Sequence, residues 1–334
     1  MKAAVYRRYG PPEVVRIEEV PTPTPEPHEV RMRVCATTVG TWDAEARAFS
    51  FPLWFGIPLR LAMGLRTPRW PILGQEAAGV VDAVGSEVTN FAAGDRVCAS
   101  LGLGFGGHAE FACVSSRGAI AHIPPNLEFA EATTLPVGGD NALHFLRMAD
   151  VQPGERVLVN GAGGNIGVLA VQLAKHFGAE VTAVDAGPKL ERLRKIGADH
   201  ALDYTSEDFA AAGPRYDVIF DLVFGSSYAR ALSALTSRGR YLLANASLPS
   251  LLRSHWTNAT RTQRVRSRFA ASRPADLETL VELAGSGAIR GVIDRRFPFE
   301  EAAAAHCYVD GGSRTGAVVL DLAGPEASGG RGGS

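Results

Sequence analysis

A glycine-dense turn between two apolar segments carries the clearest chemistry in this chain. Apolar residues 157–160 lead into glycines spaced as Gly161-x-x-Gly164-x-x-Gly167, and a second apolar segment ends at Asp185. A turn without side chains lets the pyrophosphate of a dinucleotide approach the backbone, and the N–H groups that open the following helix favour its charge. A carboxylate closing the second strand can accept hydrogen bonds from ribose hydroxyls. We therefore predict a dinucleotide site formed by Gly161, Gly163, Gly164, Asn165, Ile166 and Asp185.

The segments around this turn alternate between apolar strands and helices. The expected strands are residues 156–160, 180–185, 200–203, 218–222 and 240–244, and the expected helices are 167–177, 188–196 and 228–235. Such alternation is typical of a doubly wound parallel sheet with helices on both faces. We assign this arrangement to residues 126–271, as a dinucleotide-binding domain.

The first 125 residues have a different character, with short strands punctuated by glycine and proline. Closely spaced strands of this kind suggest a partly open β-barrel. Two helices and a strand are expected near residues 276–283, 300–308 and 317–322, and we expect them to rejoin the first domain as residues 272–323. The glycine- and serine-rich tail, residues 324–334, is expected to be disordered.

Composition excludes several classes of protein. The net charge is −1 and the isoelectric point about 6.7, so we expect no basic field for nucleic acid or an anionic membrane. The four cysteines are widely scattered, and the first residues lack an apolar signal core. No apolar run reaches the length of a membrane span. These features predict a soluble, cytoplasmic protein without a disulfide framework.

A series of short motifs follows in a fixed order along the chain, at residues 1–5, 10–14, 72–81, 91–97, 107–111, 151–159, 193–200, 217–221 and 316–320. With these motifs the whole chain, from residue 1 to about 322, resembles the zinc-independent branch of the medium-chain dehydrogenase/reductase superfamily, with its quinone oxidoreductase-like and enoyl reductase-like proteins. The resemblance implies a GroES-like catalytic domain with an inserted Rossmann domain, an NAD(P)H cofactor and a homodimer.

Zinc alcohol dehydrogenases share this fold, so zinc must be tested directly. Catalytic zinc needs three protein ligands and one open position. Zinc-binding relatives carry a cysteine within the stretch that reads Val39-Gly-Thr-Trp-Asp43 here, and a histidine where this chain has Gln75. The four-cysteine lobe for structural zinc is also missing. We predict no metal.

Asp185 and Lys189 bear on the choice between the two nicotinamide cofactors. A carboxylate at the end of the second strand binds the ribose diol of NAD(H) and repels the 2′-phosphate of NADP(H). Many relatives nevertheless use NADPH, and Lys189 or Arg192 would supply charge for that phosphate. Capping of the helix 188–196 is the structural alternative for Asp185. We predict either cofactor, with a slight preference for NAD(H).

Two further residues are assigned to the cofactor. Tyr204 follows the strand 200–203 and matches a tyrosine near the adenosine phosphate in quinone oxidoreductases. An ordinary tyrosine at a strand end explains it equally well. Asn245 follows the strand 240–244 and completes the predicted set.

Asp140 and Asn141 stand where relatives often carry a threonine near the nicotinamide. We expect Asn141 to bond the carboxamide of the cofactor and to take part in catalysis. Asp140 is expected to orient water or a proton donor. Capping of the helix over residues 142–148 is the alternative, and it is the favoured role for one of the two.

Asp43 is the third catalytic candidate, because Asp43 and Arg47 match a family pattern in which Gly40 replaces an asparagine. At this spacing the two side chains face each other on a helix, and we favour a structural ion pair between them. His108 is a candidate proton donor beside the cleft, although an uncharged loop histidine is the more common case.

The segment over residues 49–70 is rich in large apolar side chains, and in relatives this region approaches the mouth of the active site. It either forms an apolar substrate pocket or packs as a subdomain without a ligand. The predicted substrate contacts are Trp42, Trp54, Met63 and Trp70.

These observations predict a zinc-free reductase that transfers hydride from NAD(P)H to a quinone or an α,β-unsaturated carbonyl compound, with a biosynthetic pathway as its expected setting. Without a metal, hydrogen bonds must stabilise the developing oxyanion. Two alternatives stay open. One is a zinc-type alcohol dehydrogenase, and the other is a non-catalytic nucleotide-binding regulatory protein. The expected partner is a small apolar carbonyl or quinone substrate, with no nucleic acid and no membrane.

Overall fold

The computed structural model describes residues 1–268, 270 and 272–322, except for the side chains of residues 53–55. The predicted tail, residues 324–334, lies outside the described residues. The chain divides into two compact units. Unit 1 comprises Met1–Val137, Ser272–Gly285 and the segment from Ile293 onward, and unit 2 comprises Gly138–Ala271 and Ser286–Val292.

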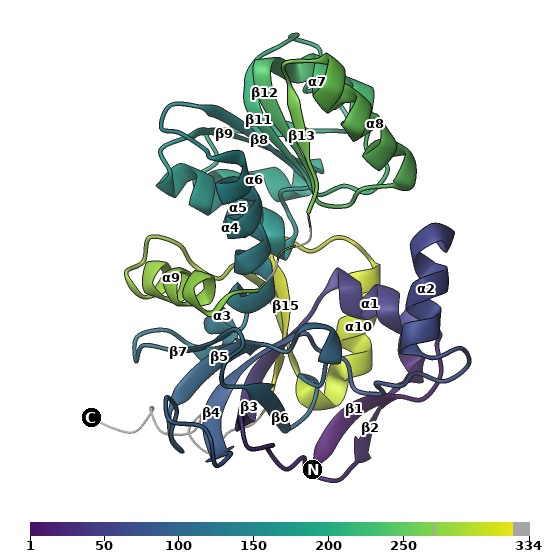
Figure 1. The fold of residues 1–334 in the computed structure, drawn as a ribbon, viewed down its shortest axis with the longest axis vertical. Helices are drawn as coiled ribbons and strands as arrows, with labels where there is room; N and C mark the ends of the chain where they lie inside the picture. Colours follow the sequence, from purple (N-terminus) through teal and green to yellow (C-terminus); the bar gives the residue numbers. More distant parts are fainter. Residues whose placement is uncertain (269, 271, 323–334) are drawn as a thin grey trace. The chain divides into compact units, whose positions relative to one another are not determined.

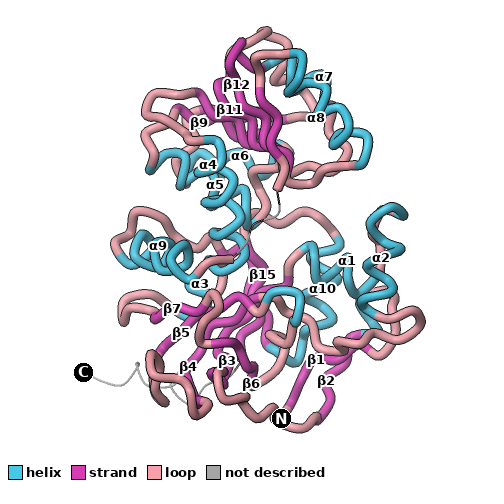
Figure 2. Tube along the Cα trace, viewed as in Figure 1, coloured by secondary structure: helices cyan, strands magenta, loops and turns pink. Residues whose placement is uncertain are grey.

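Unit 2 is built on a six-stranded parallel sheet with helices on both faces (Figure 1). The strands are β8 (Arg156–Asn160), β9 (Glu180–Asp185), β10 (His200–Asp203), β11 (Tyr216–Asp221), β12 (Leu235–Leu243) and β13 (Arg264–Arg266). The helices are α4 (Asp140–Ala149), α5 (Asn165–His176), α6 (Leu190–Lys195), α7 (Tyr228–Ala234) and α8 (Leu248–Thr260). Figure 2 shows α4, α5 and α6 on one side of the sheet and α7 and α8 on the other.

The spatial order of the strands is β10-β9-β8-β11-β12-β13. This is the doubly wound order, in which the chain fills one half of the sheet and then the other. The central strands β8 and β11 have fully buried apolar side chains, as expected for strands covered on both faces. The predicted doubly wound parallel sheet is confirmed, and β13 and α8 are additional elements.

Unit 1 contains a seven-stranded sheet and a separate two-stranded sheet. The small sheet pairs β1 (Lys2–Tyr6) with β2 (Val15–Glu19). The larger sheet runs β14-β15-β3-β4-β5-β7, with β6 also paired to β3. Its strands are β3 (Glu29–Val39), β4 (Glu76–Val84), β5 (Arg96–Ser100), β6 (Phe111–Ser115), β7 (Ile120–His122), β14 (Ile293–Pro298) and β15 (Ala317–Asp321).

The larger sheet of unit 1 does not close on itself within the described residues, because β14 and β7 end the order at opposite edges. Its helices are α1 (Thr41–Ala48), α2 (Leu53–Met63), α3 (Phe129–Ala132), α9 (Pro274–Gly285) and α10 (Ala302–Asp310). Inward-facing residues of β3, β4 and β5 form one apolar cluster with residues of α10 and β15. The predicted open β-barrel therefore appears as a curved sheet with helices packed on it.

Candidate functional site

The carboxyl ends of β8 and β11 mark the point where the strand order of unit 2 reverses. Asn160, the last residue of β8, lies in register with Asp221, the last residue of β11. Ligands of doubly wound sheets bind in the crevice outside the carboxyl ends of the strands at such a switch point. The glycine turn begins directly after Asn160, so the predicted dinucleotide residues lie where the topology requires them.

The glycines of the turn are required by its backbone and by close neighbours. Gly161 has a φ of +81°, a left-handed conformation that favours glycine. A Cβ at Gly163 would lie 2.7 Å from an oxygen of Asp185 and 2.7 Å from a carbon of Lys189. A Cβ at Gly167 would lie 2.6 Å from the backbone of Ala162, so this glycine lets α5 approach the turn.

Asn165 and Ile166 open α5 directly after the turn, and both are partly exposed. The unpaired N–H groups of a helix start, together with the helix dipole, favour an anion at this position. A narrow glycine backbone that ends in a helix start therefore fits the pyrophosphate of a dinucleotide.

Asp185 lies at the end of β9 and is already engaged by three donors. Its Oδ2 accepts a hydrogen bond of 2.7 Å from the N–H of Gly163. Its Oδ1 accepts one of 2.8 Å from the N–H of Ala186 and lies 3.0 Å from Nζ of Lys189. Both side chains of the ion pair are largely buried. Asp185 thus shapes the glycine turn, and Lys189 neutralises its charge.

Four other predicted residues lie at the same edge of unit 2 or on its first helix. Tyr204 follows β10, its N–H donates to the carbonyl of Asp185, and its ring is exposed. Asn245 follows β12, and its amide donates to the carbonyl of Leu222 at 2.7 Å. Asp140 and Asn141 open α4, with Asp140 buried and Asn141 partly exposed.

A buried polar network at the switch point was missed by the sequence reasoning. Asp221 is buried, and its Oδ1 accepts hydrogen bonds from the side-chain amide of Asn160 at 2.9 Å and from the N–H of Val223 at 3.1 Å. Its Oδ2 accepts from the hydroxyls of Ser226 and Tyr241. Burial and the neighbouring carboxylate raise the pKa of Tyr241, which therefore keeps its proton.

This network ties together the loops that follow β8 and β11. The sequence does contain an indication of this network. Asp221 ends an apolar strand, and a polar residue at the carboxyl end of such a strand lies at the ligand-binding edge of a parallel sheet.

Asp43 accepts two backbone hydrogen bonds in unit 1. Its Oδ2 accepts from the N–H of Gly40 at 2.8 Å, and its Oδ1 accepts from the N–H of Gly74 at 2.9 Å. The expected ion pair with Arg47 is not formed. Nη2 of Arg47 instead lies 2.7 Å from Oδ2 of Asp310, because α10 packs against α1.

His108 and His306 form a buried pair in unit 1. Nε2 of His108 lies 2.8 Å from the carbonyl oxygen of Thr38, so this nitrogen carries the proton. The ring of His306 meets the ring of His108 edge-on, with 5.6 Å between centroids. Burial, with smaller effects from His108 and Arg47, holds the pKa of His306 well below 6.5. Both histidines are therefore packed within this unit.

The predicted substrate residues differ in their surroundings. Met63 is buried in the apolar cluster of unit 1. Trp42 is partly buried and packs on Phe51, with 5.0 Å between ring centroids. Trp70 is partly exposed beside Phe105. The side chain of Trp54 lies outside the described residues.

Among the residues that the structure describes, no group of three or more His, Cys, Asp or Glu side chains is arranged to hold a metal ion. The four cysteines are free thiols. No described helix is both long and apolar enough to cross a bilayer.

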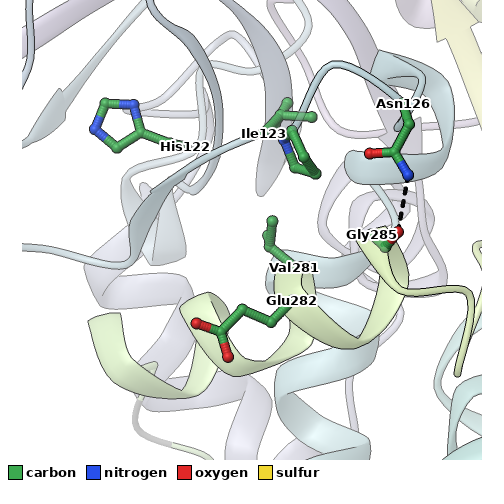
Figure 3. A pocket seen from close by; sticks show the side chains of 7 residues that line it. His122, Ile123, Asn126, Val281, Glu282 and Gly285 are labelled. Carbon is green, nitrogen blue, oxygen red and sulfur yellow. Dashed lines mark hydrogen bonds between the residues drawn. The ribbon is translucent and has the colours of Figure 1, made fainter.

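A surface pocket of about 450 Å³ lies in unit 1, between the loop after β7 and helix α9 (Figure 3). Its wall includes Ile123 and Val281, and the amide of Asn126 donates to the carbonyl of Gly285 at 2.8 Å. None of the predicted site residues lines this pocket. His122 and Glu282 also line it, but the glycine turn lies in unit 2 and is not part of its wall, so we do not assign this pocket to the active site.

Comparison with known proteins gives two family models that match this chain. Residues 26–125 match the alcohol dehydrogenase GroES-like domain, and residues 196–320 match a domain described as zinc-binding dehydrogenase. The GroES-like assignment of the first domain is thereby confirmed.

Full-length relatives are similar throughout. The NADPH-dependent alkenal/one oxidoreductase of Arabidopsis thaliana is 32% identical over 96% of this chain and 79% of its own length. The 2-haloacrylate reductase of Burkholderia sp is 30% identical over 96% of this chain and 98% of its own. The quinone oxidoreductase from Coxiella burnetii superposes with a TM-score of 0.86 at 27% identity, covering 97% of this chain and 99% of that one. The chain therefore belongs to the quinone oxidoreductase-like branch of the medium-chain dehydrogenase/reductase superfamily.

Proposed function

We propose that this protein reduces α,β-unsaturated carbonyl compounds or quinones with hydride from NAD(P)H. The observation that carries the proposal is the glycine turn at the switch point of unit 2, in a chain that is similar throughout to reductases of activated alkenes and quinones. An alkenal, an alkenone and a 2-haloacrylate each have a C=C bond conjugated to a carbonyl group. The chemistry common to these compounds is hydride addition to an electrophilic carbon.

The residues of the turn fit a dinucleotide. Gly161 and Gly163 allow the turn to pack against its protein neighbours, Gly164 is open to a pyrophosphate, and the start of α5 directs N–H groups toward its charge. When bound, the nicotinamide supplies the hydride. Asp221 holds the loops after β8 and β11 in place through Asn160 and the N–H of Val223. This positioning is the main contribution expected of a protein whose catalysis depends on placing hydride against substrate.

We expect Asp185 and Lys189 to act in opposite directions on the choice of cofactor. The carboxylate of Asp185 opposes a 2′-phosphate, and this is the basis of the slight NAD(H) preference predicted from the sequence. Lys189 attracts that phosphate and neutralises Asp185 at 3.0 Å, so the two effects largely cancel. We expect the protein to accept both cofactors, with similar catalytic efficiencies.

Asp140 and Asn141 remain our candidates for polar contacts near the nicotinamide, since both begin α4, directly after the turn Leu135–Gly139. Asp43 is a candidate of a different kind. Both of its oxygens accept backbone N–H groups, which supports a positioning role for the loop at Gly74. The variant Asp43→Asn should therefore lower the melting temperature more than it lowers kcat. A large loss of kcat at unchanged stability would favour direct catalysis by Asp43.

The decisive experiment follows oxidation of NADH and NADPH by a panel of enals, enones and quinones, with saturated aldehydes as controls. The proposal expects turnover of at least one conjugated class and none of the saturated aldehydes. Zinc-dependent turnover of alcohols or saturated aldehydes would favour the alcohol dehydrogenase alternative. Tight cofactor binding without oxidation by any member of the panel would favour a regulatory role. Analytical ultracentrifugation tests the predicted homodimer, and cell fractionation tests the predicted cytoplasmic location.

A further inference from the structure

A second carboxylate lies beside Asp185 at the carboxyl edge of the sheet in unit 2. Asp203 ends β10 and lies in register with Asp185, which ends the neighbouring strand β9. Because the two strands are parallel, both side chains belong to the edge at which doubly wound sheets bind their ligands. The glycine motif draws attention to Asp185 alone, but Asp203 carries the same charge at the same edge.

Asp203 joins the loops that follow β9 and β10. Its Oδ1 accepts hydrogen bonds from the N–H of Thr205 at 2.9 Å and from the hydroxyl of Thr205 at 2.7 Å. Its carboxylate also accepts from the N–H of Gly187, which belongs to the loop after β9. A Cβ at Gly187 would lie 2.6 Å from Oδ2 of Asp203. The loop between Asp185 and Lys189 therefore lies directly against this carboxylate.

Asp203 is charged at neutral pH and lacks a cationic partner. Hydrogen bonds from Thr205, with a smaller contribution from Gly187, hold the pKa of its carboxyl below the usual value. Asp203 forms no ion pair with any residue that the structure describes. Asp185, in contrast, lies 3.0 Å from Nζ of Lys189. The charges of that pair largely cancel, whereas the charge of Asp203 has no direct counter-charge.

We propose that Asp203 is a specificity-determining residue that disfavours the 2′-phosphate of NADP(H). In doubly wound sheets the adenosine ribose of the dinucleotide lies at the carboxylate that ends the second strand, which is Asp185 here. A 2′-phosphate adds nearly two negative charges at this ribose, beside the loop that Asp203 contacts. Like charges destabilise the bound state, and the ribose diol of NAD(H) carries no such charge.

This inference rests on the proposed function only in requiring a dinucleotide at the glycine turn. Asp185 and Lys189 oppose each other, so their pair leaves little preference of its own. The charge of Asp203 decides the remaining preference, in favour of NAD(H).

The alternative is a purely structural role, in which Asp203 only shapes the turn at Thr205. Aspartate often forms such turns by accepting hydrogen bonds from the backbone two residues on. That role needs the hydrogen bonds from Thr205 but not the contact with Gly187 on the other loop. It predicts that loss of the carboxylate weakens NADH and NADPH equally, because a loosened turn does not distinguish the two cofactors.

The test is a fluorescence titration of the full chain and its variants with NADH and with NADPH. Asp203→Asn keeps the size of the side chain and removes its charge, so the ratio of NADPH affinity to NADH affinity should rise by roughly fivefold at low salt. The rise should shrink in about 0.5 M NaCl, because salt screens exposed charges. Asp203→Glu keeps the charge, so its ratio should stay near the parent value even where the longer side chain weakens both cofactors.

Competition with shorter nucleotides localises the effect to the adenosine end. The nucleotide 2′,5′-ADP carries the 2′-phosphate and 5′-AMP does not, so Asp203→Asn should improve competition by 2′,5′-ADP roughly fivefold relative to 5′-AMP. Asp199→Asn is the matched control. Asp199 directly precedes β10 at the opposite end of the strand and also accepts a backbone hydrogen bond, from Val181 at 2.7 Å. This control should leave both ratios unchanged.

Three results would overturn the proposal. They are an unchanged ratio in Asp203→Asn, an equal rise of the ratio in Asp199→Asn, and a rise in Asp203→Glu that matches the rise in Asp203→Asn. Binding of both cofactors without turnover of any conjugated substrate would contradict the proposed function alone, and the affinity ratio would still decide the role of Asp203. Absence of binding of both cofactors to the parent protein would overturn both.

Discussion

We expect cofactor preference to shift in opposite directions on substitution of two neighbouring side chains, because Asp185 and Lys189 carry opposite charges 3.0 Å apart at the end of β9. We expect Lys189→Met to lower the affinity for NADPH and to leave the affinity for NADH nearly unchanged. A hydrogen bond to a charged group is worth about 1.5–3 kcal/mol, which is roughly a 10- to 150-fold change in affinity. The matching expectation for NADH is a change of less than about threefold, since the ribose diol carries no charge for Lys189 to bind.

Asp185→Asn should act in the opposite direction. The amide keeps the volume of the side chain but removes the negative charge that opposes a 2′-phosphate, so the ratio of NADPH to NADH affinity should rise by roughly tenfold or more. The amide also cannot accept from all three present donors, which are the N–H groups of Gly163 and Ala186 and the ammonium of Lys189. One unsatisfied buried donor costs about 1–3 kcal/mol, so the free energy of unfolding should fall by that amount.

The assay is a fluorescence titration of each protein with NADH and with NADPH, accompanied by urea unfolding. Lys195→Met is the matched control, because Lys195 ends α6, the helix that begins directly after Lys189, and its ion pair with Glu191 is exposed. This control should change neither affinity. An equal loss of affinity for NADH and NADPH in Lys189→Met would refute the role we give to this pair. An unchanged ratio of the two affinities in Asp185→Asn would refute it as well.

Three further predictions concern the turn, the buried histidine and the switch-point network. Gly163→Ala should weaken the binding of both cofactors by at least about tenfold, since the new Cβ would lie 2.7 Å from a carboxylate oxygen of Asp185. The control Gly104→Ala places its Cβ in open space and should change neither cofactor titration. His306 stays neutral in the folded state, so below pH 6.5 only the unfolded state gains a proton there. As the pH falls below 6.5, the free energy of unfolding should therefore fall by up to about 1.4 kcal/mol per pH unit. Urea titrations at several pH values should show that His306→Phe removes this pH dependence, whereas the control variant His255→Gln, at an exposed histidine, keeps it. Asp221→Asn should lower the free energy of unfolding by about 2–4 kcal/mol and weaken the binding of both cofactors, because an amide oxygen cannot accept from all four present donors. Thermal unfolding measures the first effect and cofactor titration the second. Unchanged values would contradict the role of this network.

The doubly wound sheet was predictable because its signals are local. Buried parallel strands appear as short apolar runs, and the glycine turn lies between the first of them and a helix. The strand at residues 156–160 was predicted with the bounds that the structure shows. Helix α8 and strand β13 were missed, because α8 lacks the usual pattern of an apolar inward face and β13 has only three residues.

Several site details were beyond reach of the sequence, because they depend on which elements become neighbours. Arg47 was expected to pair with Asp43 four residues away, yet it pairs with Asp310, which is 263 residues distant. Asp221 gains its partners from β8 and β12, which flank β11 in the sheet. Spacing along the chain carries no information on such pairs.

The sequence by itself determined the fold class, the position of the glycine turn and the family, since apolar periodicity, glycine spacing and motif order are properties of the chain. The tertiary structure decided what the side chains around that turn do. It bound Asp185 to Gly163 and Lys189, and it buried Asp221 at the switch point. It also placed Asp203 against the loop that follows β9. The physical reason is the same in each case: hydrogen bonds, ion pairs and burial are set by distances in space, and the packed sheet fixes those distances.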